Sequence, residues 1–287
     1  MEKQMVTSGK KGLGSIFLHI LVLLSIILAI GMLLLVIGHI LFNGVPVLLE
    51  KSGDLFSFKY TTDNQSMMPA IVNTVEMILL TLLVSVPIGV ATAIYTVEYA
   101  KPGNKFVKLT RVMTETLQGI PSIIYGLFGM LFFSQALKWG NTILSGAMTM
   151  SLMCLPLIIR STEEALLAIP MKLREASYGL GARKLRTVFK IVLPAATMGI
   201  FAGIILAIGR IVGETAALMY TAGSMAQYAT PTMNGRTLSI HMYLLTTEGK
   251  HVPEAYATGV ILIIVVIIIN AISTRIESEM KKKEQGA

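Results

Sequence analysis

IFLHILVLLSIILAIGMLLLVIGHILF occupies residues 16–42, and these 27 positions contain no Asp, Glu, Lys or Arg. A transmembrane α-helix needs about 20 mainly apolar residues, so this stretch is long enough to cross a bilayer as one helix. Lys3, Lys10 and Lys11 precede it, as basic residues precede the core of a signal peptide. A signal peptide has an apolar region of only about 7–15 residues and a small-residue cleavage site, and neither is found here. The stretch therefore predicts a retained transmembrane helix.

The whole chain has the composition of a membrane protein. Of its 287 residues, 54% are hydrophobic and 14% are charged, and its mean hydropathy is +0.71. Soluble domains carry about 25% charged residues, so this chain has too few to cover a water-facing surface. Six segments reach the length of a span and predict an all-α polytopic membrane protein with six transmembrane helices. We place them at Ile16–Phe42, Ala70–Tyr95, Ile120–Leu137, Thr142–Ile159, Ala195–Tyr220 and Tyr256–Ile272.

The basic residues are distributed unevenly between the predicted loops. If the N-terminus is inside, 18 of the 24 Lys and Arg residues lie in inner segments and 5 in outer ones, with Arg210 inside a span. Cytoplasmic loops carry an excess of Lys and Arg, so the count predicts that both termini are cytoplasmic. The same excess explains the net charge of +8. No basic stretch alternates with aromatic residues as a nucleic-acid surface would, so we expect contact with lipid and not with nucleic acid.

Motifs of intramembrane enzymes are missing from the sequence. HExxH and GxSxG do not occur, and Glu76 and Glu214 are the only carboxylates inside the predicted spans. The single cysteine, Cys154, has no neighbouring Cys or His, so it forms neither an internal disulfide nor a metal site. We therefore assign no catalytic residue and no metal ligand.

The polar segment between the fourth and fifth predicted spans, residues 160–194, has helical periodicity. Its sequence is RSTEEALLAIPMKLREASYGLGARKLRTVFKIVLP. Pro170 suits the first turn of a short helix, in which Leu173, Ala176 and Leu180 share a face. Gly179 or Gly181 would end that helix. We expect two short amphipathic helices across the cytoplasmic face; a basic helix lying on lipid would explain the charge but not the residue spacing described next.

Glu175-Ala176-Ser177, followed by Gly181 and then by the run IVLP at residues 191–194, resembles the EAA loop of permease subunits of ABC-type importers. Ser177 stands where the family usually has Ala. The resemblance implies the type I ABC importer permease architecture, in which this loop forms coupling helices seated in a groove of an ATP-binding subunit. It implies coupling roles for Glu175, Ala176, Ser177, Gly181, Ile191, Leu193 and Pro194.

Arg210 and Glu214 place two charges in the fifth predicted span. An intramembrane charge is costly and is a functional hypothesis by default. Their i, i+4 spacing puts both on one helix face, where they can pair. Two interpretations are open: a structural ion pair that joins two helices, or an arginine that faces the pathway and donates to an oxyanion while Glu214 sets its orientation.

RIVGETAALMYTA at residues 210–222 resembles the RxxGETAPLxFTA segment of phosphate ABC permeases, with Ala217 in place of proline. Further resemblance lies in AIYTVEYA (residues 93–100), QGIPSIIYGLFG (118–129) and LIIRSTEE (157–164). It implies a substrate pathway that includes Arg210, Glu214 and Thr215. Arg160 ends the fourth predicted span. Its side chain either snorkels to the membrane boundary or lines the same pathway, and we include Arg160 among the pathway residues.

The resemblance implies a permease subunit of an ATP-driven, binding-protein-dependent phosphate importer in a prokaryotic inner membrane. Its implied partners are a sister permease subunit, two copies of an ATP-binding subunit and an extracytoplasmic phosphate-binding protein. GxxxxGK[ST] is absent here, so ATP and Mg would be bound by the partner ATPase and this chain has no cofactor of its own. Alternatives are a permease for sulfate or molybdate, an intramembrane enzyme, and a signalling or scaffold protein.

The resemblance also predicts the organisation of the chain. Residues 1–69 hold an N-terminal cytoplasmic tail, the first span and an outer loop. Residues 70–274 form the permease domain, which contains the coupling loop at 160–194. Residues 275–287 form a basic cytoplasmic tail.

Overall fold

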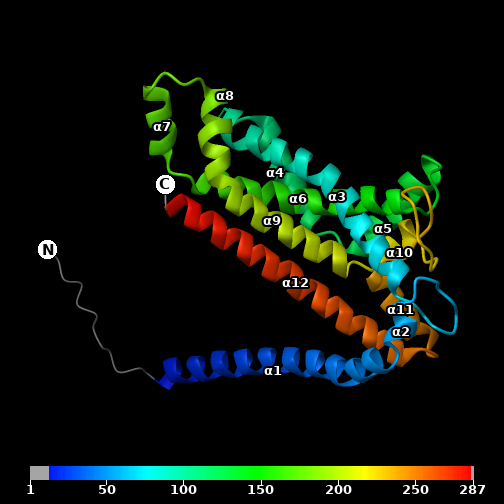
Figure 1. The fold of residues 1–287 in the computed structure, drawn as a ribbon. Coiled ribbons are helices and arrows are strands. Elements are labelled where there is room, and N and C mark those ends of the chain that lie inside the picture. Colours follow the sequence, from blue (N-terminus) through cyan, green and yellow to red (C-terminus); the bar gives the residue numbers. More distant parts are fainter. Residues whose placement is uncertain (1–12, 102, 286–287) are drawn as a thin grey trace.

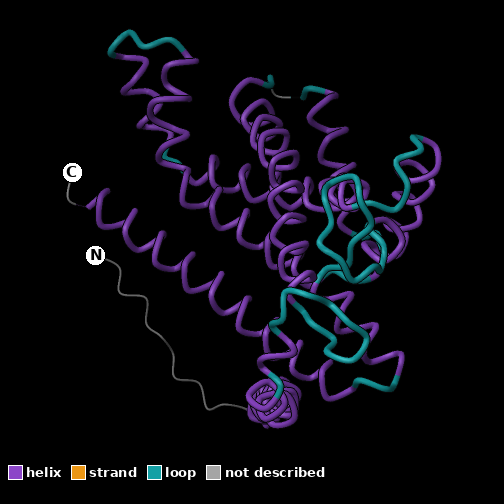
Figure 2. Tube along the Cα trace, turned by 45° about the vertical axis from the view of Figure 1, so that its right-hand side comes forward, coloured by secondary structure: helices purple, strands orange, loops and turns teal. Residues whose placement is uncertain are grey.

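The computed structural model describes residues 13–101 and 103–285, which contain helices and loops but no strand (Figure 2). The long helices are α1 (Leu13–Glu50), α3 (Met68–Ile94), α6 (Ile143–Ala168), α9 (Leu193–Gly213) and α12 (Val252–Gln285). The shorter helices are α2 (Ser52–Leu55), α4 (Lys105–Gln118), α5 (Ser122–Gly129), α7 (Met171–Gly179), α8 (Lys184–Thr187), α10 (Ala216–Thr221) and α11 (Leu238–Glu248). Three π-helical segments extend them: η1 (Tyr95–Tyr99), η2 (Met130–Ala136) and η3 (Val188–Val192).

The prediction of an all-α protein with six spans is confirmed. Five helical stretches among the described residues are long and apolar enough to cross a membrane: Phe17–Glu50, Met68–Tyr99, Ile143–Ala168, Lys184–Gly213 and Val252–Arg275. A bent pair, Lys105–Gln118 and Ser122–Ala136, whose axes differ by 105°, makes six when it is counted as one broken span. The predicted third span, Ile120–Leu137, is thus only part of a broken span, since Pro121 disfavours a helical conformation at the residue before it.

The predicted fifth span, Ala195–Tyr220, is wrong at both ends. Helix α9 is continuous with α8 and η3, so the span begins at Lys184, and it stops at Gly213. Glu214 has an extended conformation with ψ of 127°, and α10 starts after Thr215. Side chains satisfy the backbone groups freed by this break, because Ser239 Oγ donates to the Glu214 carbonyl over 2.6 Å.

Small residues allow the central helices to pack closely. Gly199 and Gly203 of α9 lie against Ala165 and Ser161 of α6 and leave no room for a Cβ atom. Gly89 of α3 lies against Ile158 of α6 in the same way. Such small residues let helices approach each other in a membrane. Helices α3, α6 and α9 therefore form the rigid centre of the molecule.

Helix α1 lies at the margin of the bundle and diverges from α12 along most of its length (Figure 1). The C-terminal part of α1 contacts the N-terminal part of α12, where His39 Nε2 and Tyr256 Oη lie 3.2 Å apart. The apolar window of α1 is otherwise uncovered within this chain. Lys3, Lys10 and Lys11 lie outside the described residues, and the predicted tail from residue 275 continues α12 to Gln285.

Candidate functional site

Helix α7 projects at one end of the bundle, beside α8 and near the C-terminal end of α12 (Figure 1). Glu175 and Ala176 are exposed on it, whereas Ser177 is buried. The Ser177 and Thr187 hydroxyl oxygens lie 2.8 Å apart and join α7 to α8. Two residues of the EAA-like motif therefore face outward, and the third holds the helix in place.

The outward side of α7 is rich in apolar side chains. Leu173, Ala176 and Leu180, predicted to share a face, are all exposed, and Leu180 is 89% exposed. The other exposed apolar residues of this region are Met171, Tyr178 and Leu185. Apolar groups gathered on an exposed surface mark a contact with a protein or a membrane, so α7 presents an interaction surface.

A buried ion pair fixes α7 to the rest of the molecule. Arg174 Nη2 lies 2.7 Å from Glu98 Oε1 at the end of α3, and both side chains are below 10% exposed. The same guanidinium donates to the carbonyl oxygens of Leu166 (2.9 Å) and Ile169 (2.7 Å) at the end of α6. Sequence analysis missed this pair; the signal available was a carboxylate, Glu98, directly after an apolar span.

Only one of the two short helices predicted for the coupling loop stands alone. The first, before Pro170, is the end of α6, which continues to Ala168, and the second, opened by Pro170, is α7. Gly181 has φ of +80°, a left-handed conformation that glycine adopts without strain, and it ends the turn after α7. The segment that follows forms α8, which runs without interruption through η3 into α9. Ile191 and Leu193 are half-buried, and Pro194 lies in the first turn of α9. A proline removes a backbone donor from a helix and so disturbs the turn before it. The π-helical segment η3 lies in that turn, before Pro194.

Arg210 lies in the last turn of α9 and is half-buried. The pairing with Glu214 that the i, i+4 spacing allows is not seen: none of the ion pairs among the described residues includes Arg210 or Glu214. The reason is the break after Gly213, which takes Glu214 off the helical face. Arg210 is about 24 Å along the helix axis from Pro194, at the helical rise of 1.5 Å per residue.

Glu214 serves the next helix instead of Arg210. Its Oε1 atom accepts a hydrogen bond from the Ala217 N–H over 3.1 Å, which caps the start of α10. A proline at residue 217 could not donate this bond. Thr215, the residue before α10, is half-buried and makes no capping hydrogen bond. Glu214 and Thr215 thus form the break between α9 and α10, and Arg210 lies in the last helical turn before it.

Arg160 does not end its span as predicted, because α6 continues to Ala168. Its Nε atom lies 3.1 Å from Glu164 Oε1, and both side chains are more than half exposed. The neighbouring Ser161 packs against Gly203 of α9. Gly203 precedes Arg210 by two helical turns, so Arg160 lies about 10 Å from Arg210 along the axis, towards α7.

The break is supported by close packing of α10 on α5, and this gives a first prediction. A Cβ atom at Gly126 would lie 2.7 Å from Ala217 Cα, which is backbone and has no freedom to move aside. We expect Gly126→Ala to destabilise the protein by about 1–3 kcal/mol. Thermal unfolding of the purified protein measures this. Gly119→Ala is the control, since its Cβ would meet only Thr116 O at 3.5 Å; equal unfolding temperatures for both variants would contradict the packing argument.

Comparison with known proteins identifies the family. The family model described as binding-protein-dependent transport system inner membrane component matches residues 85–282. The probable ABC transporter permease protein YqgI of Bacillus subtilis (strain 168) is 33% identical over 86% of this chain and 89% of its own length. The phosphate transport system permease protein PstA of Haemophilus influenzae is 30% identical over 90% of this chain and 92% of its own. A PstA homolog of Mycoplasma pneumoniae is 32% identical, and the chain spans only 39% of that longer relative.

Solved structures agree on the fold. An inward-facing structure of the MetNI methionine ABC transporter matches with a TM-score of 0.58 and 21% identity, over 74% of this chain and 93% of that chain. A bacterial alginate ABC transporter in complex with its alginate-pentasaccharide-bound periplasmic protein matches with a TM-score of 0.57 and 19% identity, over 87% and 95%. Both share the type I ABC importer permease fold, and relatives of this kind are transporter subunits and not enzymes. The chain belongs to the family of binding-protein-dependent transport system inner membrane components.

Proposed function

We propose that this chain is a permease subunit of an ATP-driven importer of inorganic phosphate and forms half of its translocation pathway. The observation that carries the proposal is the combination, in one bundle, of the exposed helix α7 at one end and Arg210 beside a helix break, about 24 Å along the axis of α9 from Pro194. The relatives named as phosphate transport permeases support phosphate as the substrate. They do not favour sulfate or molybdate.

The importer fold requires an ATPase and a substrate-binding protein as partners. We propose that these are two copies of an ATP-binding subunit and an extracytoplasmic phosphate-binding protein, with a sister permease completing the pathway. ATP and Mg would bind the ATPase subunits, and this chain would hold no cofactor. Lipid would cover the apolar outer faces of the spans.

The chain is a multi-pass membrane protein, and we propose that both its termini are cytoplasmic. The excess of Lys and Arg in the inner segments supports this orientation. The position of α7 and α8 at the same end of the bundle as the end of α12 agrees with it (Figure 1). The opposite end, with α2 and α11, would then face the binding protein.

Arg210 would donate to the phosphate oxygens, since a guanidinium fork matches an oxyanion. Glu214 and Thr215 would shape the break beside it, and Arg160 would lie further along the same path. Motion of the ATPase would reach the pathway through α7. The Arg174–Glu98 pair and the Ser177–Thr187 contact would pass that motion to α3, α6 and α9.

The proposed function is tested by uptake of labelled inorganic phosphate in cells that lack this subunit. We expect the wild-type chain to restore phosphate uptake, with sulfate and molybdate uptake unchanged. Restored uptake of sulfate or molybdate in place of phosphate would contradict the substrate assignment. No restored uptake of any oxyanion, with the protein present in the membrane, would contradict the whole proposal.

The coupling role of α7 gives a second prediction. Glu175 is exposed, so Glu175→Lys should leave the fold intact. The substitution places a cation where the groove of the ATPase would contact the Glu175 carboxylate. We expect phosphate uptake to fall about tenfold or more at an unchanged membrane level. Glu164→Gln, which removes an exposed carboxylate of α6 outside this helix, is the control. Equal uptake by the Glu175 variant and the wild type would argue against docking through α7.

A further inference from the structure

Arg236 is a buried cation without a counter-charge. It lies in the segment that joins α10 to α11 and is 5% exposed. Its Nη2 atom has no hydrogen-bond partner, and no ion pair within residues 13–101 and 103–285 includes it. Its guanidinium carbon lies 4.9 Å from the centroid of the Tyr60 ring. An uncompensated buried charge is strongly destabilising, so this arginine calls for a ligand that the described part of the chain does not supply.

His241 is a second buried group without a partner. It lies on α11, is 0% exposed, and neither ring nitrogen has a hydrogen-bond partner in the described part of the chain. Burial, and then the positive charge of Arg236, lowers the pKa of His241 to about 3; the nearby Gln65 backbone opposes the shift and is the smallest of the three effects. The ring is therefore neutral at physiological pH, and a neutral imidazole offers one donor and one acceptor nitrogen.

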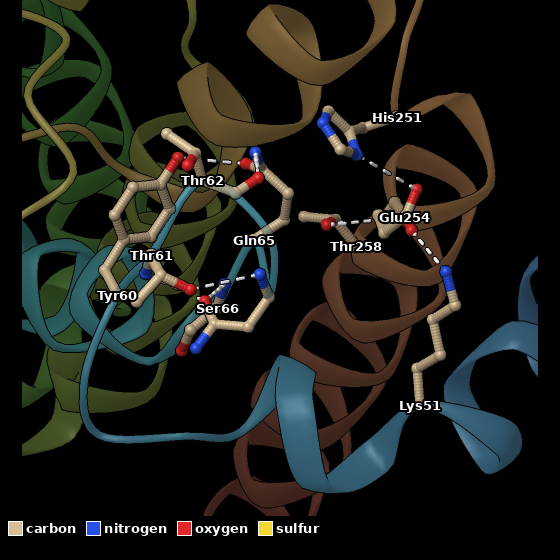
Figure 3. A network of polar contacts seen from close by, with 10 residues as sticks. Lys51, Tyr60, Thr61, Thr62, Gln65, Ser66, His251, Glu254 and Thr258 are labelled. Carbon is tan, nitrogen blue, oxygen red and sulfur yellow. Dashed lines mark hydrogen bonds and ion pairs between the residues drawn. The ribbon is translucent and has the colours of Figure 1, made fainter.

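The surroundings of Arg236 are held in place by polar contacts on the outer side of the bundle. Tyr60 Oη donates to Gln65 Oε1 over 2.9 Å (Figure 3). This bond fixes the ring that contacts the Arg236 guanidinium. The Asn73 amide donates to the Arg236 carbonyl over 3.1 Å. Lys51 Nζ lies 2.7 Å from Glu254 Oε1 and ties the start of the outer loop to α12 (Figure 3).

The same segment reaches the break beside Arg210. Ser239, three residues after Arg236, donates to the Glu214 carbonyl. A path along the chain therefore runs from the outer loop through Arg236 to the helix break, and from there to Arg210. The two arginines are successive cations on this path, and neither has an ion-pair partner among the described residues.

We propose that Arg236 and His241 form an oxyanion site on the outer side of the Arg210 break, and that its ligand is hydrogen phosphate. This inference rests on the proposed function. The guanidinium donates to the deprotonated phosphate oxygens, and the acceptor nitrogen of His241 accepts a hydrogen bond from the phosphate hydroxyl, which keeps its proton. Sulfate carries no proton at neutral pH, so it leaves that nitrogen unpaired. Both side chains are covered here, so the ion enters when the outer loop and the 222–237 segment separate.

The first test compares the thermal unfolding of the purified importer complex with and without oxyanions. In oxyanion-free buffer we expect Arg236→Met to unfold at the wild-type temperature or above, because the variant no longer buries an unpaired charge. Inorganic phosphate should then raise the unfolding temperature of the wild type more than that of the variant. Other phosphate sites in the complex are common to both proteins and cancel in this comparison.

Two outcomes of this test would overturn the site. One is that Arg236→Met unfolds at a lower temperature than the wild type in oxyanion-free buffer and is stabilised by phosphate as much as the wild type is. This result is expected if Arg236 has only a structural role. The other is an equal rise in the unfolding temperature of the wild type with phosphate and with sulfate at the same ionic strength. His241 is assigned the hydrogen bond from the phosphate hydroxyl, and sulfate has no such hydroxyl at neutral pH. His241→Leu should reduce the response to phosphate and leave that to sulfate unchanged.

The second test measures phosphate uptake per ATP hydrolysed in proteoliposomes with the binding protein. We expect this ratio to fall about tenfold in Arg236→Met and less in Arg236→Lys, which keeps the charge. Lys250→Gln, which removes an exposed cation of an outer loop, should leave it unchanged. A parallel fall of uptake and hydrolysis, or a wild-type ratio, would overturn the Arg236 site alone. A wild-type complex that takes up no phosphate would instead overturn the proposed function.

Discussion

Arg210→Gln is expected to reduce phosphate uptake about a hundredfold or more while the protein accumulates normally in the membrane. Arg210 makes no ion pair within the described chain, so the substitution breaks no structural pair. It removes instead a charged donor from the end of α9. A hydrogen bond to a charged group contributes about 1.5–3 kcal/mol, and a guanidinium fork makes two of them. Uptake of labelled phosphate by cells that carry only the variant measures the loss.

The controls separate charge from geometry at Arg210. Arg210→Lys keeps the positive charge but loses the fork, so we expect intermediate uptake. Lys250→Gln removes a cation from an exposed outer position and should leave uptake unchanged. Normal uptake by Arg210→Gln at a normal membrane level would show that this arginine lies outside the pathway.

Breaking the Arg174–Glu98 pair is expected to have the second large effect, on both stability and coupling. Arg174→Met leaves the Glu98 carboxylate buried without a partner and frees the carbonyl oxygens of Leu166 and Ile169. Loss of one partner of a buried pair costs about 3–5 kcal/mol, which lowers the unfolding temperature by on the order of 10 °C. Thermal unfolding of the purified protein and phosphate uptake at low temperature measure the two consequences.

A comparison of single and double variants tests the origin of this effect. Glu98→Gln should be milder than Arg174→Met, because Arg174 then keeps its bonds to the end of α6. The double variant Glu98→Leu with Arg174→Met should be more stable than Arg174→Met alone, since no unpaired charge remains. Glu164→Gln breaks an exposed pair and should change stability by less than about 1 kcal/mol. Similar losses in the Glu164 and Arg174 variants would mean that burial of the pair is unimportant.

The exposed face of α7 shows how far local sequence can specify a site. The helical period places Leu173, Ala176 and Leu180 together, and all three are exposed in the structure. Gly179 and Gly181 end the helix and its turn as their lack of a Cβ atom predicts. What the period did not reveal is that the neighbouring Arg174 points inward, because its partner Glu98 is 76 positions away in the chain.

The break beside Arg210 shows the limit more sharply. Residues 195–220 form an apolar run whose hydropathy fits one continuous helix. The chain leaves the helix at Glu214 because contacts from elsewhere replace the helical hydrogen bonds, above all the Ser239 hydroxyl on the Glu214 carbonyl. The bend at Gly119 and Pro121 had a local cause, and the proline within the sequence was its visible signal.

By itself, the sequence determined that this is an all-α membrane protein, where most of its spans lie and which side chains of α7 share an exposed face. These properties depend on hydropathy, helical period and spacing, which act over a few neighbouring residues. Only the tertiary structure decided that Arg210 and Glu214 form no ion pair, that Arg174 is anchored to Glu98, and that Arg236 is buried with no counter-charge from residues 13–101 and 103–285. These properties depend on which distant side chains meet in space, and the free energy of such meetings is set by burial and pairing that no local pattern encodes.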